Sequence, residues 1–212
     1  MKRNSDEILD KLEEMFPNAE CELNHESTFQ LLIAVILSAQ TTDVSVNKVT
    51  PNLFSKYPDA FALANANLSD VENCIRNLGL YRNKAKNIIE CAIQLVNEYN
   101  GEVPSTMKEL TSLAGVGRKT ANVVLSVAFS IPAIAVDTHV DRISKRLGLS
   151  KPQDNVLDVE TKLKRKIKRE RWNRAHHLFI FFGRYFCTAK NPKCKECPFI
   201  EICKDKIKEK MC

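Results

Sequence analysis

The sequence predicts a soluble all-α protein that works inside the cell. Segment after segment carries apolar residues at helical spacing, with a capping residue in front and a glycine, asparagine or proline behind. Alternating runs typical of strands are few, and aromatic residues make up only 7% of the chain. Apolar residues make up 44% of the 212, enough to bury a core. The longest apolar run, Leu31 to Leu37, is far shorter than the ~20 residues that cross a membrane.

The first half of the chain predicts helices with clear ends. Ser5 is expected to cap the first helix, which Pro17 ends. Residues 29–39 are apolar nearly all round, so this helix is expected at the centre of a core. Pro51 should kink or split the helix predicted over residues 43–57.

Capping residues mark the helices that follow. A capping box of Ser69 and Glu72 begins a helix that Gly79 ends. The remaining predicted helices are Arg82–Tyr99, Thr106–Leu113, Lys119–Phe129, Thr138–Leu147, Val156–Lys168 and Asn173–Phe186.

The charge is unevenly distributed along the chain. Residues 1–132 hold 12 Lys and Arg against 16 Asp and Glu, whereas residues 133–212 hold 20 against 10. A segment this basic suits phosphate backbones, because each neutralised phosphate releases counterions and adds affinity. The alternative is a basic face that only keeps the protein soluble.

Four of the eight cysteines lie close together in the sequence. They are Cys187, Cys194, Cys197 and Cys203, while Cys21, Cys74, Cys91 and Cys212 are scattered. Residues 1–20 carry six acids and no apolar stretch, so no secretory signal is expected and a disulfide framework is disfavoured. Four thiolates at this spacing could bind a structural zinc ion or an iron–sulfur cluster.

The segment from Leu113 to Ala121 predicts a turn between two helices. Gly115 and Gly117 permit positive φ angles and let another backbone approach closely. The start of the second helix offers backbone N–H groups and the positive end of the helix dipole, which together bind anions. Such a hairpin holds a DNA phosphate without reading the base sequence. The alternative is an ordinary glycine turn between core helices.

Asp137 directly follows the apolar residues 131–136 and precedes a predicted helix. An unpaired carboxylate there would be costly, so the simplest role is that of a helix N-cap. Paired with a half-buried Lys119, it also has the chemistry of a nucleophile and its acid–base partner.

The motifs together resemble the endonuclease III family of helix-hairpin-helix DNA glycosylases and abasic-site lyases. The resemblance covers essentially the whole chain. It is carried by the motifs Leu37-Ser38-Ala39-Gln40-Thr41-Thr42-Asp43, Gly79-Leu80-Tyr81, the hairpin with Lys119, Val136-Asp137-Thr138-His139, Gly183-Arg184 and the cysteine spacing.

The resemblance implies an all-α fold of two lobes with a cleft between them. One lobe is a six-helix barrel of residues 22–132, with the helix-hairpin-helix motif at about 106–129. The other joins residues 1–21 to residues 133–212 and contains the cysteine loop, 187–203. This loop would bind one 4Fe-4S cluster per chain through Cys187, Cys194, Cys197 and Cys203.

The implied substrate is double-stranded DNA with a damaged base or an abasic site. Lys119 would attack C1′ of the deoxyribose and displace an oxidised pyrimidine, and Asp137 would stabilise charge on the sugar. β-Elimination through the Schiff base would then cut the strand 3′ to the site. The damaged nucleotide would lie outside the helical stack, with Gln40 as a polar plug and Leu80 as an apolar wedge. Further implied DNA contacts are Gly115, Val116, Gly117, Arg118, Thr120, His139, Lys190 and Lys193, and Ser38 and Asp43 would line the pocket.

Several residues have simpler interpretations. Gln40 could bond a helix end, and Leu80 could belong to the core. The basic run of residues 162–171 could be a solvated face, and His176 and His177 are expected to pack rather than bind metal. Two residues depart from the family pattern. Ala114 stands where the hairpin commonly has proline, and Phe182 stands where related sequences often have histidine.

Three other functions stay open at this point. The adenine-mismatch glycosylase shares the fold and the cluster but lacks a lysine at position 119 and has an additional C-terminal domain. A non-enzymatic helix-hairpin-helix protein would need no Lys119–Asp137 pair. A zinc-stapled interaction module would explain the cysteines alone. For the implied enzyme we expect a monomer in the cytoplasm, associated with the nucleoid while it is bound to DNA, and no membrane partner.

Overall fold

The structure, a computed structural model, describes residues 4–207 and 209, and Cys212 lies outside them. The described residues form helices and connecting loops without a β-strand, which confirms the predicted fold class. The α-helices are α1 (Ser5–Met15), α2 (Thr28–Leu37), α3 (Asp43–Lys56), α4 (Ala60–Ala64), α5 (Leu68–Ile75), α6 (Tyr81–Tyr99), α7 (Met107–Ser112), α8 (Arg118–Ala128), α9 (Thr138–Arg146), α10 (Val156–Lys166) and α11 (Trp172–Phe181). Among the described helices, none is long and apolar enough to cross a membrane.

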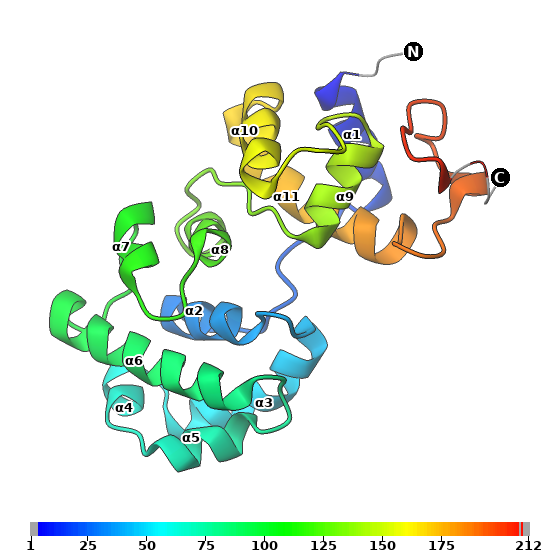
Figure 1. The fold of residues 1–212 in the computed structure, drawn as a ribbon. Coiled ribbons are helices and arrows are strands. Elements are labelled where there is room, and N and C mark those ends of the chain that lie inside the picture. The colour runs from blue at the N-terminus through cyan, green and yellow to red at the C-terminus, as the bar shows by residue number, and fades with distance from the viewer. Residues whose placement is uncertain (1–3, 208, 210–212) are drawn as a thin grey trace. The chain divides into compact units, whose positions relative to one another are not determined.

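The chain divides into two compact units. One comprises Cys21–Ser130, and the other comprises the described residues on either side of that range. The predicted bounds of the first lobe are residues 22–132. Helices α2 to α8 therefore belong to one unit, and α1 with α9 to α11 belong to the other (Figure 1).

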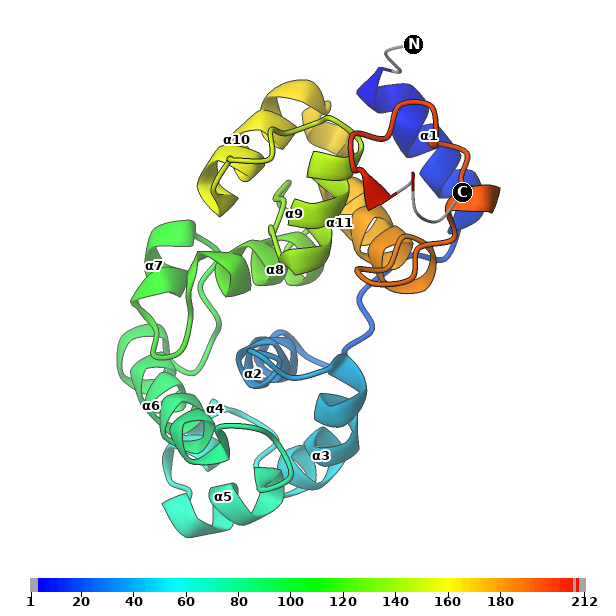
Figure 2. The ribbon, with the colours of Figure 1, turned by 45° about the vertical axis from the view of Figure 1, so that its right-hand side comes forward.

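Helix α2 forms the centre of the Cys21–Ser130 unit, with α3, α6 and α8 packed on it (Figure 2). Its residues Phe29 and Leu31–Leu37 are all buried, as the unbroken apolar run predicted. The helix begins after Ser27, whose side chain accepts a hydrogen bond from the Gln30 N–H, and it ends at Leu37 rather than Ala39. Burial of this whole helix anchors the loop of residues 38–42.

Local expectations differ from the structure at four places. Asn67, not the pair Ser69 and Glu72, caps α5, and its side chain accepts from the Ser69 N–H at 2.9 Å. Ser5 lies inside α1 and donates to the Lys166 carbonyl, so a tertiary contact replaces the expected cap. Helix α3 continues through Pro51, because Val46, Val49 and Leu53 are buried on both sides of it. The short helix α4 was not predicted.

The second unit has an aromatic core. Phe182 is fully buried, stacks on Phe186 at 5.3 Å and meets Phe16 and Phe199 edge to face. It begins a π-helical turn, Phe182–Phe186, that follows α11. Position 182 therefore carries a packing residue in this chain.

Most of the basic run is paired with acids rather than solvated. Lys162 contacts Asp154 and Lys164 contacts Glu160, each at 2.6 Å. Arg171 contacts Asp10 on α1 at 2.8 Å, and α1 lies beside α11 in Figure 1. As expected, Leu163 and Ile167 point into the core. These cations stabilise the unit and are poor candidates for DNA contacts.

His177 on α11 makes the unit sensitive to mild acid. Burial, helped by Arg174, lowers the pKa of His177 to about 4 from its ordinary 6.5. Between these values the unfolded chain binds a proton that the folded chain does not, so stability falls as the pH drops through this window. The difference is about 2 kcal/mol at pH 5 relative to pH 7. We expect His177→Gln to remove most of this pH dependence, as measured by urea unfolding at pH 7 and pH 5. An equal pH dependence in both proteins would contradict it.

Candidate functional site

The hairpin between α7 and α8 is built as the glycines predicted, but only one of them needs a positive φ. Gly115 has φ +75°, and a Cβ there would lie 3.0 Å from Asn87 Cβ and 3.1 Å from Ile36 Cγ2. Gly117 has φ −89° and caps α8, and a Cβ there would meet nothing within 4 Å. Gly115 thus lets the turn pack on α2 and α6, whereas Gly117 leaves open space on the outside.

The first turn of α8 meets the requirements of an anion site. Its N-cap is a glycine, so no side chain caps the helix. Gly117, Arg118 and Lys119 are exposed and Thr120 is half-buried. Val116 is buried and its N–H donates to the Leu113 carbonyl at 3.1 Å, so it anchors the turn. The helix dipole and the N–H groups of this turn favour negative charge.

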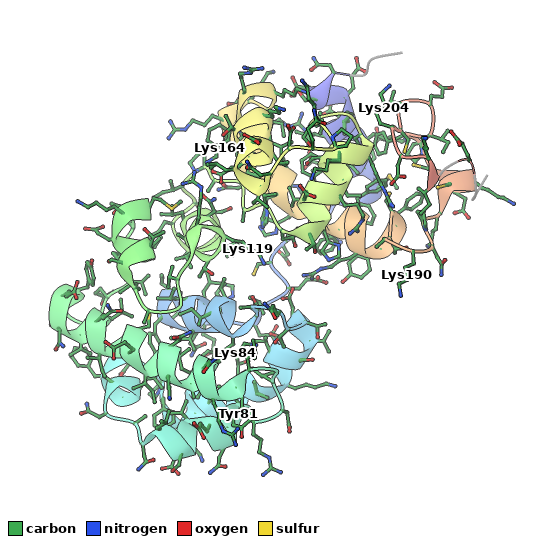
Figure 3. All side chains as sticks on the ribbon, in the orientation of Figure 1. Tyr81, Lys84, Lys119, Lys164, Lys190 and Lys204 are labelled. Atoms are coloured by element: carbon green, nitrogen blue, oxygen red, sulfur yellow. The ribbon has the colours of Figure 1, made fainter. Side chains whose placement is uncertain are left out.

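Lys119 is the second residue of α8 and is exposed, not half-buried as expected (Figure 3). The buried residues of α8 begin at Ala121, two positions after the lysine, so Lys119 lies ahead of the part of the helix that packs into the core. Within the described chain its ammonium group makes no hydrogen bond or ion pair. The amine is therefore available to react with a molecule that binds at the hairpin.

Gln40 and Leu80 adopt the same unusual backbone conformation. Their φ angles are +54° and +58°, in the left-handed region that non-glycine residues rarely occupy. Leu80 is 60% exposed, which excludes the interpretation of a core residue. The exposed Gln40 side chain bonds no helix end within the described chain. Both side chains are exposed on the Cys21–Ser130 unit.

The residues next to Gln40 are arranged around the end of α2. The Ser38 hydroxyl donates to the Val35 carbonyl at 2.9 Å, which closes the last turn of the helix. Asp43 begins α3 and is half-buried. Both predicted pocket residues lie within five positions of Gln40 in the same unit.

Asp137 is the N-cap of α9 and is held in a defined orientation. Its Oδ1 accepts hydrogen bonds from the backbone N–H groups of His139 and Val140 at 2.9 and 2.8 Å. The preceding residues 133–136 are buried. In the described part of the chain, Oδ2 accepts no hydrogen bond, so one oxygen positions the carboxylate and the other is available for chemistry.

His139 and Gly183 pack tightly behind Asp137. A Cβ on Gly183 would lie 3.0 Å from His139 Cβ, so only glycine lets the two segments approach this closely. Arg142 donates to the Gly183 carbonyl at 2.8 Å and contacts His139 Nδ1 at 3.2 Å. Burial lowers the pKa of His139, partly opposed by Asp137. The arrangement fixes the start of α9.

The cysteine loop begins after the π-helical turn. The guanidinium of buried Arg146 donates to Cys187 Sγ at 3.2 Å and to the Thr188 carbonyl at 2.8 Å. Burial, together with the neighbouring thiols of Cys187, Cys203 and Cys194, raises the pKa of Cys197 to about 11. In the part of the chain described, no three His, Cys, Asp or Glu side chains are placed to hold one metal ion. The four thiols are neighbours that do not converge on a single point.

The lysines of this loop are exposed. Lys190 and Lys193 lie between Cys187 and Cys194, and Lys193 extends over the Phe186 ring at 5.9 Å. Figure 3 shows Lys190 projecting outward from the loop. Both are free to contact phosphates.

Sequence reasoning missed Lys84 on α6. This lysine is only 4% exposed, and its ammonium donates to the Thr41 hydroxyl next to Gln40. Burial lowers its pKa. A signal was present in the sequence, because Lys84 falls in the row of apolar positions that includes Ile88 and Leu95.

The glycine hairpin with its exposed lysine at the start of α8, and the basic loop that carries four cysteines, are features of the helix-hairpin-helix proteins of the DNA-glycosylase class. The family model described as "HhH-GPD superfamily base excision DNA repair protein" matches residues 33–169. Endonuclease III of Bacillus subtilis (strain 168) is 53% identical over 197 residues, which cover 93% of this chain and 90% of that protein. Endonuclease III of Escherichia coli (strain K12) is 46% identical over 202 residues, 95% of each. The chain belongs to the endonuclease III family of the HhH-GPD superfamily.

Solved structures agree with this assignment. A trapped endonuclease III–DNA covalent intermediate has a TM-score of 0.93 at 53% identity, covering 97% of this chain and 96% of that chain. A non-covalent endonuclease III–DNA complex has the same TM-score at 52% identity and the same coverage. A thermostable thymine-DNA glycosylase, at 23% identity and a TM-score of 0.82, shares the fold.

Proposed function

We propose that this base-excision-repair glycosylase releases oxidised pyrimidines from duplex DNA and then cuts the strand 3′ to the abasic site. The observation that carries the proposal is the amine of Lys119, unpartnered within the described chain, at the uncapped start of α8. A phosphate on the hairpin would bring a deoxyribose toward this amine. The endonuclease III whose DNA-bound structure resembles this chain was trapped as a covalent intermediate, which supports covalent chemistry here.

In the proposed reaction Lys119 Nζ forms a bond to C1′ while the bond from C1′ to the base nitrogen breaks. The base leaves with the bonding electrons and takes up a proton, and opening of the sugar ring produces a Schiff base. Loss of a proton from C2′ then expels the 3′ phosphate, and water releases the lysine. The attacking amine must be neutral, and the available oxygen of Asp137 suits both proton transfer and stabilisation of positive charge on the sugar.

The DNA contacts we propose come from both units. Gln40 and Leu80 fill the space of the displaced nucleotide, and the backbone of residues 115–120 holds a phosphate. His139, Lys190 and Lys193 add contacts from the second unit. Phosphate contacts of this kind position the enzyme without reading the base sequence, as repair of a lesion in any context requires.

The four neighbouring cysteines support a proposed 4Fe-4S cluster, one per chain. Burial and the neighbouring thiols raise the pKa values of Cys187 and Cys197, so these two thiols need a strong positive charge nearby before they ionise, and iron supplies it. In such a cluster each of the four cysteines binds its own iron. When bound, the cluster would hold the loop together. Arg146 would orient Cys187, and the loop would present Lys190 and Lys193.

The function is tested with a panel of duplexes, each with one damaged base. We expect release of oxidised pyrimidines, a 3′ incision, and a covalent adduct when borohydride reduces the Schiff base. Release of adenine from mismatches without an adduct would instead indicate the adenine-mismatch activity. Binding with neither base release nor an adduct would indicate a non-enzymatic DNA-binding protein.

Metal analysis tests the cluster. We expect yellow-brown protein with about four irons per chain. Cys197→Ser should lose the colour and the iron and weaken DNA binding, whereas Cys21→Ser is the matched control that should keep both. Colourless protein with one zinc per chain would disprove the cluster and leave the zinc module as the explanation of this loop.

A further inference from the structure

We infer that helix α6 holds the three predicted DNA-contacting loops in register, through Lys84 near one end and Gln94 near the other. The loops are the Gln40 loop (residues 38–42), the Leu80 turn (residues 79–80) and the hairpin turn (residues 113–117). The inference rests on the proposed function and assigns positioning roles to two residues that do not touch DNA. All of these residues lie in the Cys21–Ser130 unit.

Lys84 ties the Gln40 loop to the Leu80 turn. Its backbone N–H donates to the Leu80 carbonyl at 3.0 Å, and its ammonium donates to the Thr41 hydroxyl. Figure 3 shows Lys84 between α6 and the region of α2. The backbone bond is the first hydrogen bond of α6, with Leu80 as the N-cap, and the side-chain bond reaches Thr41 beside Gln40. Lys84 therefore joins the Gln40 loop to the helix turn that begins at Leu80.

Burial of the Lys84 ammonium costs free energy, so another interaction must compensate for it. The described chain places no carboxylate against the ammonium, and the hydroxyl that receives it is neutral. Gln40 and Leu80, moreover, both hold left-handed backbone conformations, which persist only when the surroundings impose them. The hydrogen bond from Lys84 on α6 to Thr41 supplies such a constraint for the Gln40 loop, and the start of the same helix follows directly on Leu80.

Gln94 ties the hairpin turn to the same helix. Its Oε1 accepts a hydrogen bond from the Ala114 N–H at 2.7 Å, and its Nε2 donates to the Ser112 carbonyl at 3.4 Å. The contact between Gly115 and Asn87 brings the turn against the same helix, nearer to its start. The hairpin is thus fastened to α6 on both sides of Leu113.

The bond to Ala114 fits this chain's departure from the proline that the family resemblance leads us to expect at position 114. A proline at 114 would have no N–H to donate, so the Gln94 bond requires another residue there. The chain thus replaces the stiffness of a proline ring with a hydrogen bond from a neighbouring helix. Leu113 has φ −74° and ψ 145°, the extended conformation that a following proline favours, so the turn could accept either solution.

Helix α6 sets the spacing between these attachments. Lys84 and Gln94 are ten residues apart, about 15 Å along a helix axis. That is roughly four base-pair steps along the axis of a DNA duplex. A rigid helix between the wedge and the phosphate-binding turn would keep both in register with one strand.

The Lys84 attachment is tested by comparing two substrates. An oxidised pyrimidine must be unstacked before reaction, whereas a preformed abasic site needs less distortion. We expect Lys84→Met and Thr41→Val to slow base release about tenfold more than they slow incision at a preformed abasic site. Thr41→Ser keeps the hydroxyl and should restore the ratio, and Lys86→Met is the matched control on the exposed face of α6. Equal losses on both substrates, or none, would overturn this part of the inference.

The Gln94 attachment is tested by a double-mutant cycle. We expect Gln94→Leu to weaken binding to duplex DNA with a stable abasic-site analogue about fivefold, because the turn loosens. Ala114→Pro in the Gln94→Leu background should bring affinity back to within about twofold of the wild type, since the ring replaces the missing hydrogen bond. A double variant that binds DNA no better than Gln94→Leu would disprove the role of the Gln94 attachment. If the wild-type protein neither binds this DNA nor forms the borohydride adduct, the proposed function itself fails, which separates the two outcomes.

Discussion

Lys119→Gln is expected to abolish both base release and the borohydride adduct while DNA binding survives. The variant removes the only atom in the proposed reaction that bonds to C1′. The phosphate donors of the hairpin are backbone N–H groups, which the substitution leaves in place. Single-turnover assays on an oxidised-pyrimidine duplex, with a binding assay on an abasic-site analogue, measure the two effects separately.

Two other lysines serve as controls for this variant. Lys108→Gln changes an exposed lysine on α7 and should react normally. Lys193→Ala should still form the adduct but bind all DNA sequences more weakly, and the slope of its salt dependence should fall by about one for each phosphate that is no longer bound. Full strand cleavage by Lys119→Gln would place the nucleophile elsewhere and overturn the mechanism.

Asp137→Asn is expected to slow the reaction by about 10²-fold or more at unchanged stability, as removal of a positioned acid–base group does. The asparagine oxygen can still accept from the N–H groups of His139 and Val140, so the cap of α9 is kept. The substitution therefore removes the charge and leaves the fold intact.

Stability and rate must be measured together to separate these roles. Thermal unfolding of Asp137→Asn should match the wild type, while its single-turnover rate falls. Asp141→Asn, one turn along α9, is the matched control and should retain the rate. If the rate of Asp137→Asn falls only in proportion to the fraction of protein that is unfolded, Asp137 is a helix cap and nothing more.

Local sequence patterns predicted much of the fold because their causes are local. The Thr106 cap of α7 forms as expected, because its hydroxyl oxygen accepts from the Glu109 N–H at 3.3 Å, and the hydroxyl also donates to the Glu109 carboxylate at 2.6 Å. The apolar run of α2 is buried throughout. Prediction failed where tertiary contacts compete, as when Ser5 bonds to Lys166 or when buried neighbours keep α3 continuous through Pro51.

The features of the candidate site likewise fall into those that local sequence predicts and those that depend on tertiary contacts. The sequence by itself determined the glycine turn, the cap at Asp137 and the clustering of four cysteines, because each depends on residues close together in the chain. Only the tertiary structure showed that Lys119 is exposed, that Leu80 projects from the surface, and that Lys84 and Gln94 fasten the loops of residues 38–42 and 113–117 to α6. Thr41 and Lys84 are 43 residues apart and Gln94 and Ala114 are 20 apart, and a hydrogen bond over such separations depends on how whole helices pack. That packing results from summed burial over many side chains, which no local pattern encodes.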